Sequence, residues 1–266
     1  MYDKILIPIA QNTNVKLIMD FVDNMLNSGG EITLLYVIPS DKLPVSAVEW
    51  RRAMKVITEA QALSMDRNME VNYKVKNNPS VAQGILKEAA STTYDLVLMS
   101  TPREARKGRL FGSKIDEVVR KAPVETVVLS YPENAALSYK KILIPTSGYR
   151  HALRAARIAE NLAKKHGGEI TVMYVGSRSD EAETIIHPLI SDIESNGVKA
   201  RSLFAAGPIA ETILNEAKQG YNIMMIGATE RPAYQEFLLG STADRLIRDA
   251  PCPVLMVKTA GRPYQP

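Results

Sequence analysis

The chain has 266 residues, of which 45% are hydrophobic and 23% are charged. This composition is typical of a folded globular protein and argues against disorder, and the length suits one large domain or two domains of about 130 residues. The formal charge of +4 and the sequence pI near 9.0 are mild, and only 6% of the residues are aromatic. Nucleic-acid binders usually concentrate basic residues and interleave them with aromatic ones, so we expect no nucleic-acid partner.

Targeting and cysteine signals are sparse. The first residues run directly into Ile5, Leu6 and Ile7 without a charged and then apolar leader, so we expect no signal peptide. No apolar run approaches the roughly 20 residues that a membrane span needs. Cys252 is the only cysteine, which excludes a disulfide scaffold and a cysteine-based metal site. These features predict a cytoplasmic protein without membrane insertion.

The chain repeats itself. The Lys-Ile-Leu-Ile-Pro of residues 4–8 recurs at 141–145, and the Gly-Gly-Glu-Ile-Thr of residues 29–33 recurs at 167–171. Leu-Phe-Gly-Ser at 110–113 matches Leu-Leu-Gly-Ser at 238–241, and the Ala-Pro pair at 122–123 matches that at 250–251. Four anchors in one order indicate a tandem duplication with a period longer than that of solenoid repeats. We expect domains at 1–131 and 139–266, joined by a linker at 132–138.

Short apolar stretches alternate with amphipathic ones in the first copy. Ile18, Phe21, Val22 and Met25 form a helical stripe, and Gly29 is a candidate helix stop. The predicted elements in chain order are strand 3–9, helix 13–28, strand 31–38, a helix within 44–67, strand 70–76, helix 79–92, strand 96–99, helix 113–121 and strand 125–130.

The second copy repeats this order, and its first helix, with an apolar stripe from Ala155 to Ala163, ends at Gly167. Alternating strands and helices predict βαβ units, a parallel sheet and helices on both faces. The fold class is therefore two tandem doubly wound α/β domains, each with a five-stranded parallel sheet. Ligands of such sheets bind at the carboxyl ends of the strands, near the point where the strand order reverses.

A phosphate-binding pattern lies near the end of the second copy. A buried strand, 223–226, is followed by Gly227 and Thr229, and Gly240 then leads through Ser241 and Thr242 into a helix. Glycines allow a sharp turn and a close approach to a ligand, and the helix start offers unpaired N–H groups and a partial positive charge. The hydroxyls of Ser241 and Thr242 add donors.

At these residues the chain resembles a tandem universal stress protein, with the adenine nucleotide alpha hydrolase-like fold. Nucleotide-binding members carry Gly, two residues, Gly, nine residues, then Gly-Ser/Thr, and here Gly227 and Gly240 lie at the matching separation. The resemblance implies that adenine is read by backbone groups at Thr146 and Val175, and that the ligand is ATP or AMP, with Mg²⁺. It also implies that the two halves pair with each other through their final strands, 125–130 and 254–258; a further homodimer is open.

This sequence departs from the family pattern at several positions. Glu230 replaces the middle glycine, and a carboxylate about 5 Å from a phosphate would cost roughly two decades of affinity. The ribose-binding aspartate of the family is replaced by Ala10 in the first copy and Ser147 in the second. In the first copy, Ser100 and Arg103 replace the first two glycines, so we expect no family-type ATP binding there.

Two function classes remain open. The first is a stress-response binding module with a weak adenine-nucleotide site in the second copy, and the second is an interaction protein without nucleotide. Weak ATP hydrolysis ranks last because no general base is evident, and we predict no catalytic residue. His151, His166 and His187 have no metal-ligand spacing, so no metal site is predicted.

Overall fold

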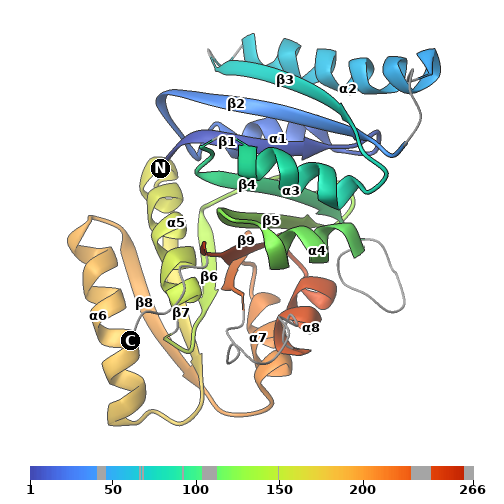
Figure 1. Cartoon of the computed structure of the whole chain (residues 1–266). Coiled ribbons are helices and arrows are strands. Elements are labelled where there is room, and N and C mark those ends of the chain that lie inside the picture. Colours follow the sequence, from blue (N-terminus) through green and yellow to red (C-terminus); the bar gives the residue numbers. More distant parts are fainter. Residues whose placement is uncertain are drawn as a thin grey trace. The chain divides into compact units, whose positions relative to one another are not determined.

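The structure is a computed structural model that describes residues 1–40, 46–65, 67, 69–91, 93–103, 113–148, 150–228 and 241–260. Its contacts divide the chain into two compact units. The first is mainly Met1–Thr101 with the helix and strand that follow it to Val128, and the second is mainly Leu129–Lys258. Each unit contains one run of alternating strands and helices (Figure 1).

The first unit is built on a sheet with the strand order β3-β2-β1-β4-β5. Strand β1 pairs in parallel with β2 and β4, and β2 pairs in parallel with β3. The helices α1 and α2 pack together, as do α3 and α4, which covers the sheet with two helix pairs. The element bounds are β1 Tyr2–Ile9, α1 Val15–Val22, β2 Leu26–Ile38, α2 Ala47–Met65, β3 Glu70–Asn77, α3 Val81–Ser91, β4 Leu96–Pro102, α4 Ser113–Lys121 and β5 Glu125–Tyr131.

The second unit repeats this plan with the strand order β10-β9-β6-β7-β8, and every one of these neighbours pairs in parallel. The strand order reverses between β6 and β9, because the chain leaves β6 toward β7 and β8 and later returns to the other side. The bounds are β6 Lys141–Pro145, α5 Arg150–His166, β7 Glu169–Val175, α6 Asp180–Ser195, β8 Lys199–Ala205, α7 Ile209–Ala217, β9 Ile223–Gly227, α8 Ser241–Asp249 and β10 Val254–Lys258. The predicted fold class is confirmed.

The first helix of each copy was predicted to end at a glycine, and only one of the two predictions is right. Helix α5 ends at His166, and Gly167 follows with a φ of 61°. Helix α1 ends at Val22, whereas the prediction extended it to residue 28 with Gly29 as the stop. Gly29 lies inside β2. The register with β1 jumps from Tyr2↔Leu26 to Lys4↔Glu31, so the β2 residues between these two pairs form a bulge. The apolar stripe continues beyond the helix because Met25 remains fully buried in the turn.

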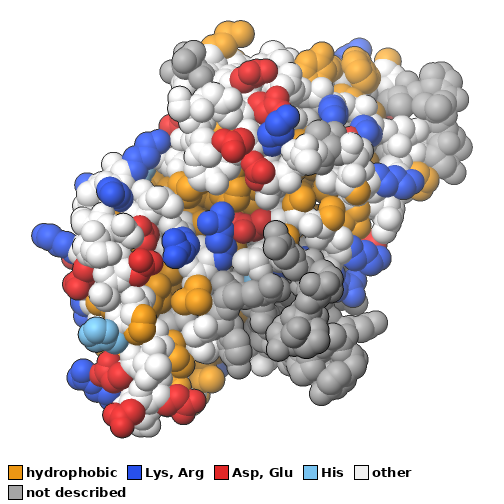
Figure 2. Space-filling view, turned by 60° about the vertical axis from the view of Figure 1, so that its left-hand side comes forward, with side chains coloured by type: hydrophobic (Ala, Val, Ile, Leu, Met, Phe, Trp, Pro, Cys, Tyr) orange, Lys and Arg blue, Asp and Glu red, His pale blue; other side chains and the backbone are white. Residues whose placement is uncertain are grey.

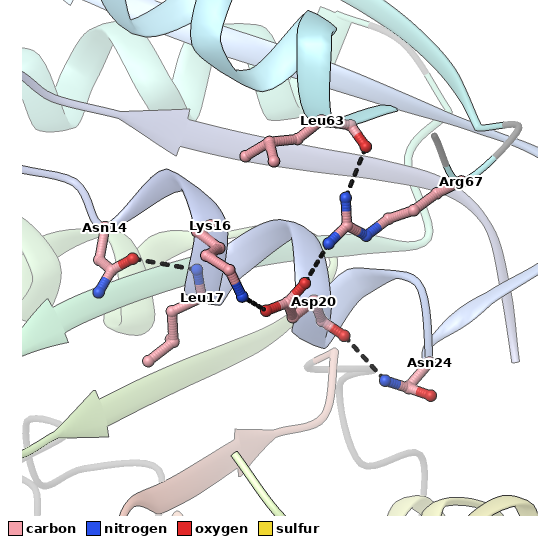
Figure 3. A network of polar contacts seen from close by, with 7 residues as sticks. All are labelled: Asn14, Lys16, Leu17, Asp20, Asn24, Leu63 and Arg67. Atoms are coloured by element: carbon pink, nitrogen blue, oxygen red, sulfur yellow. Dashed lines mark hydrogen bonds and ion pairs between the residues drawn. The ribbon is translucent and has the colours of Figure 1, made fainter. Parts of the chain in front are cut away.

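A polar network ties α1 to α2 (Figure 3). The carboxylate of Asp20 on α1 accepts from Lys16 Nζ at 2.9 Å and forms an ion pair with Arg67. Arg67 also donates to the carbonyl of Leu63 at 2.6 Å, in the last turn of α2. A cation at this end suits the helix dipole, so one guanidinium both caps α2 and holds α1.

A tyrosine–glutamate pair occurs at the same place in both copies, and its glutamate is fully buried only in the first. The Tyr94 hydroxyl donates to Glu88 of α3 at 2.8 Å, and the Tyr221 hydroxyl donates to Glu216 of α7 at 2.7 Å. In the first unit, Lys74 on β3 completes the cluster at 2.6 Å from the glutamate; in the second, Arg201 on β8 stands at 3.7 Å. The duplication therefore extends to the polar contacts that attach a helix to the outer strand of each sheet.

The described part of the chain contains no helix that is long and apolar enough to cross a membrane. On the face drawn in Figure 2, lysine and arginine side chains are interspersed with aspartate and glutamate.

Candidate functional site

A cavity of about 350 Å³ opens at the carboxyl ends of β6, β7 and β9 in the second unit. This is where the strand order reverses, the position at which open parallel sheets bind ligands. The first turns of α7 and α8 close its sides. The lining residues are Pro145, Thr146, Ser147, Ala152, Met173, Tyr174, Val175, Ile209, Ile213, Ile226, Gly227, Ala228, Thr242, Ala243 and Leu246.

Two hydroxyls lie at the end of β6, one buried and hydrogen-bonded and the other exposed. Thr146 is buried; its N–H donates to Met173 O at 2.9 Å, and its Oγ1 accepts from the Gly148 N–H at 3.1 Å. Gly148 has a φ of 84°, which favours glycine in this tight turn. Between them, Ser147 is exposed at the rim of the cavity. Of the two hydroxyls, that of Ser147 is therefore the one presented to solvent.

Gly227 owes its identity to helix packing. A Cβ at this position would lie 2.6 Å from the carbonyl carbon of His151 and 2.9 Å from Ala152 Cα, both in the first turn of α5. Its φ is not positive, and the next residue, Ala228, continues the backbone ladder by donating to Val257 O at 2.8 Å. The glycine allows α5 to rest directly on the end of β9, which places Ala152 in the cavity wall.

Helix α8 begins at the cavity. Ser241 is its first residue and is exposed, while Thr242 and Ala243 line the cavity. The amides of a helix's first turn have no partner within the helix and favour an anion. The remaining predicted site residues, Thr229 and Gly240, lie outside the described residues, as does Glu230.

Aliphatic side chains form much of the cavity wall. Met173 and Val175 come from β7, Ile226 comes from β9, and Ile209 and Ile213 come from α7. Sequence reasoning did not select the α7 pair, although the first turn of a helix that follows a sheet strand lies close to the sheet edge. Ile209 is 53% exposed, which is unusual for an isoleucine and follows from its place at the open side of the cavity.

Comparison with known proteins decides the family. The model of the universal stress protein family matches residues 1–130, 138–188 and 192–258, which is most of the chain in two successive copies. The chain belongs to the universal stress protein family. It is 32% identical over 152 residues to a universal stress protein of Methanocaldococcus jannaschii, and this match covers 50% of the chain and 89% of that protein.

Solved structures show the same fold. The structure of a universal stress protein from Archaeoglobus fulgidus superposes with a TM-score of 0.72 at 19% identity, covering 96% of this chain and 97% of that one. A putative universal stress protein from Pseudomonas aeruginosa gives 0.66 at 18% identity, with 97% and 94% covered. Each superposition covers nearly the whole of both chains, so the shared fold extends over both copies of this chain.

The corresponding region of the first copy is built differently. Arg103 stands where the second glycine of the family motif would be, and by its contacts it groups with the second unit. Its guanidinium donates to the carbonyl of Ala250 and, at 3.1 Å, to that of Cys252. Burial lowers the pKa of Arg103, although the group remains a cation. Arg103 therefore serves backbone carbonyls, and the rest of the basic loop to Arg109 lies outside the described residues.

His166 and Cys252 both take part in the packing of the second unit. Among the described residues, no group of three His, Cys, Asp or Glu side chains could hold a metal ion. His166 closes α5 and packs on Tyr139, with ring centroids 4.9 Å apart. Cys252 lies between Pro251 and Pro253, just before the last strand, and is buried.

Proposed function

We propose that this tandem universal stress protein is a stress-response binding module whose C-terminal domain, residues 139–266, binds an adenine nucleotide weakly. The ligand is AMP, or ATP with Mg²⁺. The N-terminal domain, residues 1–131, and the linker, 132–138, serve a structural role. The observation that carries the proposal is the cavity at the strand-order reversal, where Thr146, Ser147, Val175, Gly227 and Thr242 come together. Its volume lies at the small end of the range for ligand pockets, roughly 300–1,000 Å³.

The cavity matches the two parts of a nucleotide. A purine base is flat and largely apolar on its faces, and the aliphatic wall formed by Val175, Ile209 and Ile226 suits such a ring. A phosphate suits the first turn of α8, where Thr242 lines the cavity and Ser241 adds a second hydroxyl. The proposal includes Thr229 and Gly240 on the sequence pattern alone.

Calorimetric titration of the full chain with AMP, ATP and Mg-ATP tests this proposal. The informative variant is Thr242→Asp, because a carboxylate in the first turn favours the helix but repels a phosphate. At about 5 Å and an effective dielectric near 20, the repulsion is roughly 3 kcal/mol, or about two decades of affinity. Lys114→Asp, at the matching position of α4 in the first copy, is the control and should leave binding unchanged.

The results separate the possibilities. The proposal is supported if the natural chain binds the nucleotide, Thr242→Asp binds it about a hundredfold more weakly, and Lys114→Asp binds it as tightly as the natural chain. An equal loss of affinity in both variants would show that the site was assigned to the wrong copy. Absence of heat at millimolar AMP and ATP, together with no nucleotide released from the purified protein, would contradict nucleotide binding altogether.

A second candidate function is recruitment of a protein partner without any nucleotide. Two large apolar side chains at the start of α2 favour it: Val48 is 55% exposed and Trp50 is 49% exposed. Exposed tryptophan is enriched where proteins bind one another. Trp50 is the only tryptophan of the chain, so Trp50→Ala removes the exposed ring without touching another. An immobilised Trp50→Ala chain that retains the same proteins from a cell extract as the natural chain would count against this candidate.

We also propose that the two domains pair with each other through the final strand of each copy, residues 125–130 and 254–258. An uncovered outer strand exposes backbone hydrogen-bonding groups, and a second copy in the same chain supplies a partner at high effective concentration. Segments 1–131 and 139–266, expressed separately and mixed, should co-elute in size-exclusion chromatography. Elution as two independent species would contradict the pairing. Light scattering of the full chain tests for a further homodimer.

A further inference from the structure

The strand order of the second unit assigns positions along the cavity. Strand β6 lies between β9 on one side and β7 on the other. Val175, the part of the aliphatic wall at the end of β7, and the first turn of α8, which follows β9, lie on opposite sides of β6. A nucleotide with its base against Val175 and its phosphate at α8 places its sugar over the end of β6. The residues there are Thr146 and Ser147.

The end of β6 cannot grip a sugar diol strongly. Reading two neighbouring hydroxyls is usually the task of a carboxylate, which accepts both hydrogen bonds with full charge. None of the described residues that line the cavity carries a charged side chain. The hydroxyl of Thr146 already accepts from the Gly148 N–H at 3.1 Å, and its side chain is buried. Ser147 remains, and its single neutral hydroxyl oxygen is a weaker acceptor for two sugar hydroxyls than the two charged oxygens of a carboxylate.

Ser147 is also exposed, which lowers the cost of an unmade contact. A buried polar group that loses its partner costs the full penalty of desolvation, whereas an exposed hydroxyl exchanges the ligand for water. Removing a sugar hydroxyl from the ligand therefore leaves Ser147 hydrated, and little affinity is lost.

We propose that the C-terminal site does not discriminate by the ribose hydroxyls, so that 2′-deoxy and 3′-deoxy adenine nucleotides are ligands of the same rank as AMP. Ser147 is the residue that determines this tolerance. The inference rests on the proposed nucleotide-binding function and goes beyond it by naming the ligand class. Recognition comes from the base at the aliphatic wall and the phosphate at α8.

Calorimetric titration of the full chain with AMP, 2′-deoxy-AMP and 3′-deoxy-AMP tests the inference. For the natural chain, the three dissociation constants should agree within about threefold. Ser147→Ala should weaken AMP binding by no more than about tenfold, the range of one neutral hydrogen bond, and the three ligands should still agree within about threefold. Ser147→Asp restores a two-oxygen acceptor, so AMP should then bind at least about tenfold more tightly than either deoxy nucleotide. An exposed position tolerates both substitutions without unfolding, which circular dichroism verifies.

Each outcome has one meaning. Failure of AMP itself to bind overturns the proposed function and this inference together. Binding of AMP with more than about tenfold weaker binding of either deoxy nucleotide overturns the inference alone and leaves the nucleotide site standing. Equal ratios in the natural chain and in Ser147→Asp would show that the sugar does not lie over the end of β6, and that result also overturns it.

Discussion

Gly227 at the end of β9 and Ala152 in the first turn of α5 approach so closely that a Cβ on the glycine would stand 2.9 Å from Ala152 Cα. The obstacle is backbone, which cannot rotate away as a side chain can. A residue that was selected from sequence as part of a phosphate-binding turn thus also determines where a helix sits, and both residues line the cavity.

The contact predicts the effect of Gly227→Ala. The added methyl group must push α5 away from the sheet, so we expect a loss of about 1–3 kcal/mol in the free energy of unfolding, the usual cost of overpacking. Chemical denaturation measures it. Ser100→Ala, at the matching position of the first copy, is the control and should change stability by less than about 1 kcal/mol. A loss of stability in Gly227→Ala no larger than that in Ser100→Ala would mean that α5 moves to accommodate the methyl group without cost.

The buried carboxylate of Glu88 predicts an acid-sensitive first unit. Burial raises the pKa of Glu88, but hydrogen bonds from Lys74, Lys76 and Tyr94 outweigh this effect and lower the pKa to about 2. Because the folded pKa lies below the ordinary value of about 4.3, the stabilisation is complete above that value and is lost as the pH falls toward 2. We expect the ionised carboxylate of Glu88 to contribute about 2 kcal/mol to the free energy of unfolding. This is less than the full pKa shift would give, since both lysine side chains reach solvent.

Glu88→Gln removes this dependence. The variant should be less stable at neutral pH, and its free energy of unfolding should fall less between pH 5 and pH 3 than that of the natural chain. Glu216→Gln is the matched control in the second copy, where Arg201 is 3.7 Å away and the glutamate side chain is 20% exposed. Its effect should be smaller. A pH profile of Glu88→Gln that parallels the natural one would contradict the assignment.

The network of Figure 3 predicts unequal contributions from its two cations. Burial raises the pKa of Asp20, but hydrogen bonds from Lys16 and Arg67 outweigh this and lower it. The Lys16 side chain is 72% exposed, so Lys16→Ala should cost no more than about 0.5 kcal/mol. Arg67→Ala removes both the ion pair with Asp20 that joins α1 to α2 and the bond to the Leu63 carbonyl at the end of α2, and should cost about 1–2 kcal/mol. Thermal unfolding of the two variants measures the difference, and equal shifts would contradict it.

The only cysteine should be inert in the folded chain. Burial raises the pKa of Cys252 to about 11, and neighbouring Arg103 offsets this only in part. At pH 8 about one thiol in a thousand is then ionised, and the thiolate is the reactive form. Alkylation by iodoacetamide, followed by mass spectrometry, should be at least about a hundredfold slower in the native protein than in denaturant. Rapid native labelling would show that the strand start opens readily.

Local pattern predicted the elements well where one helix or strand determines its own ends. The stop of α5 at Gly167 needs only a residue that accepts a positive φ, and that requirement is legible in sequence. The end of α1 is not legible, because the choice between helix and strand at residues 26–30 depends on pairing with β1, a partner distant in the chain. Similarly, the α7 residues Ile209 and Ile213 could be expected to be apolar but not to face a cavity.

The amino-acid sequence by itself determined the duplication, the doubly wound α/β class, the family and the sheet edge at which the candidate site lies. These follow from residue order and hydrophobic period, which are local properties repeated along the chain. Only the tertiary structure decided that Gly227 is required by the backbone of α5, that Arg103 serves carbonyl groups, and that Thr146 is committed while Ser147 is presented to solvent. The physical reason is that each depends on a distance between atoms far apart in the sequence, and such distances arise only when the layers pack.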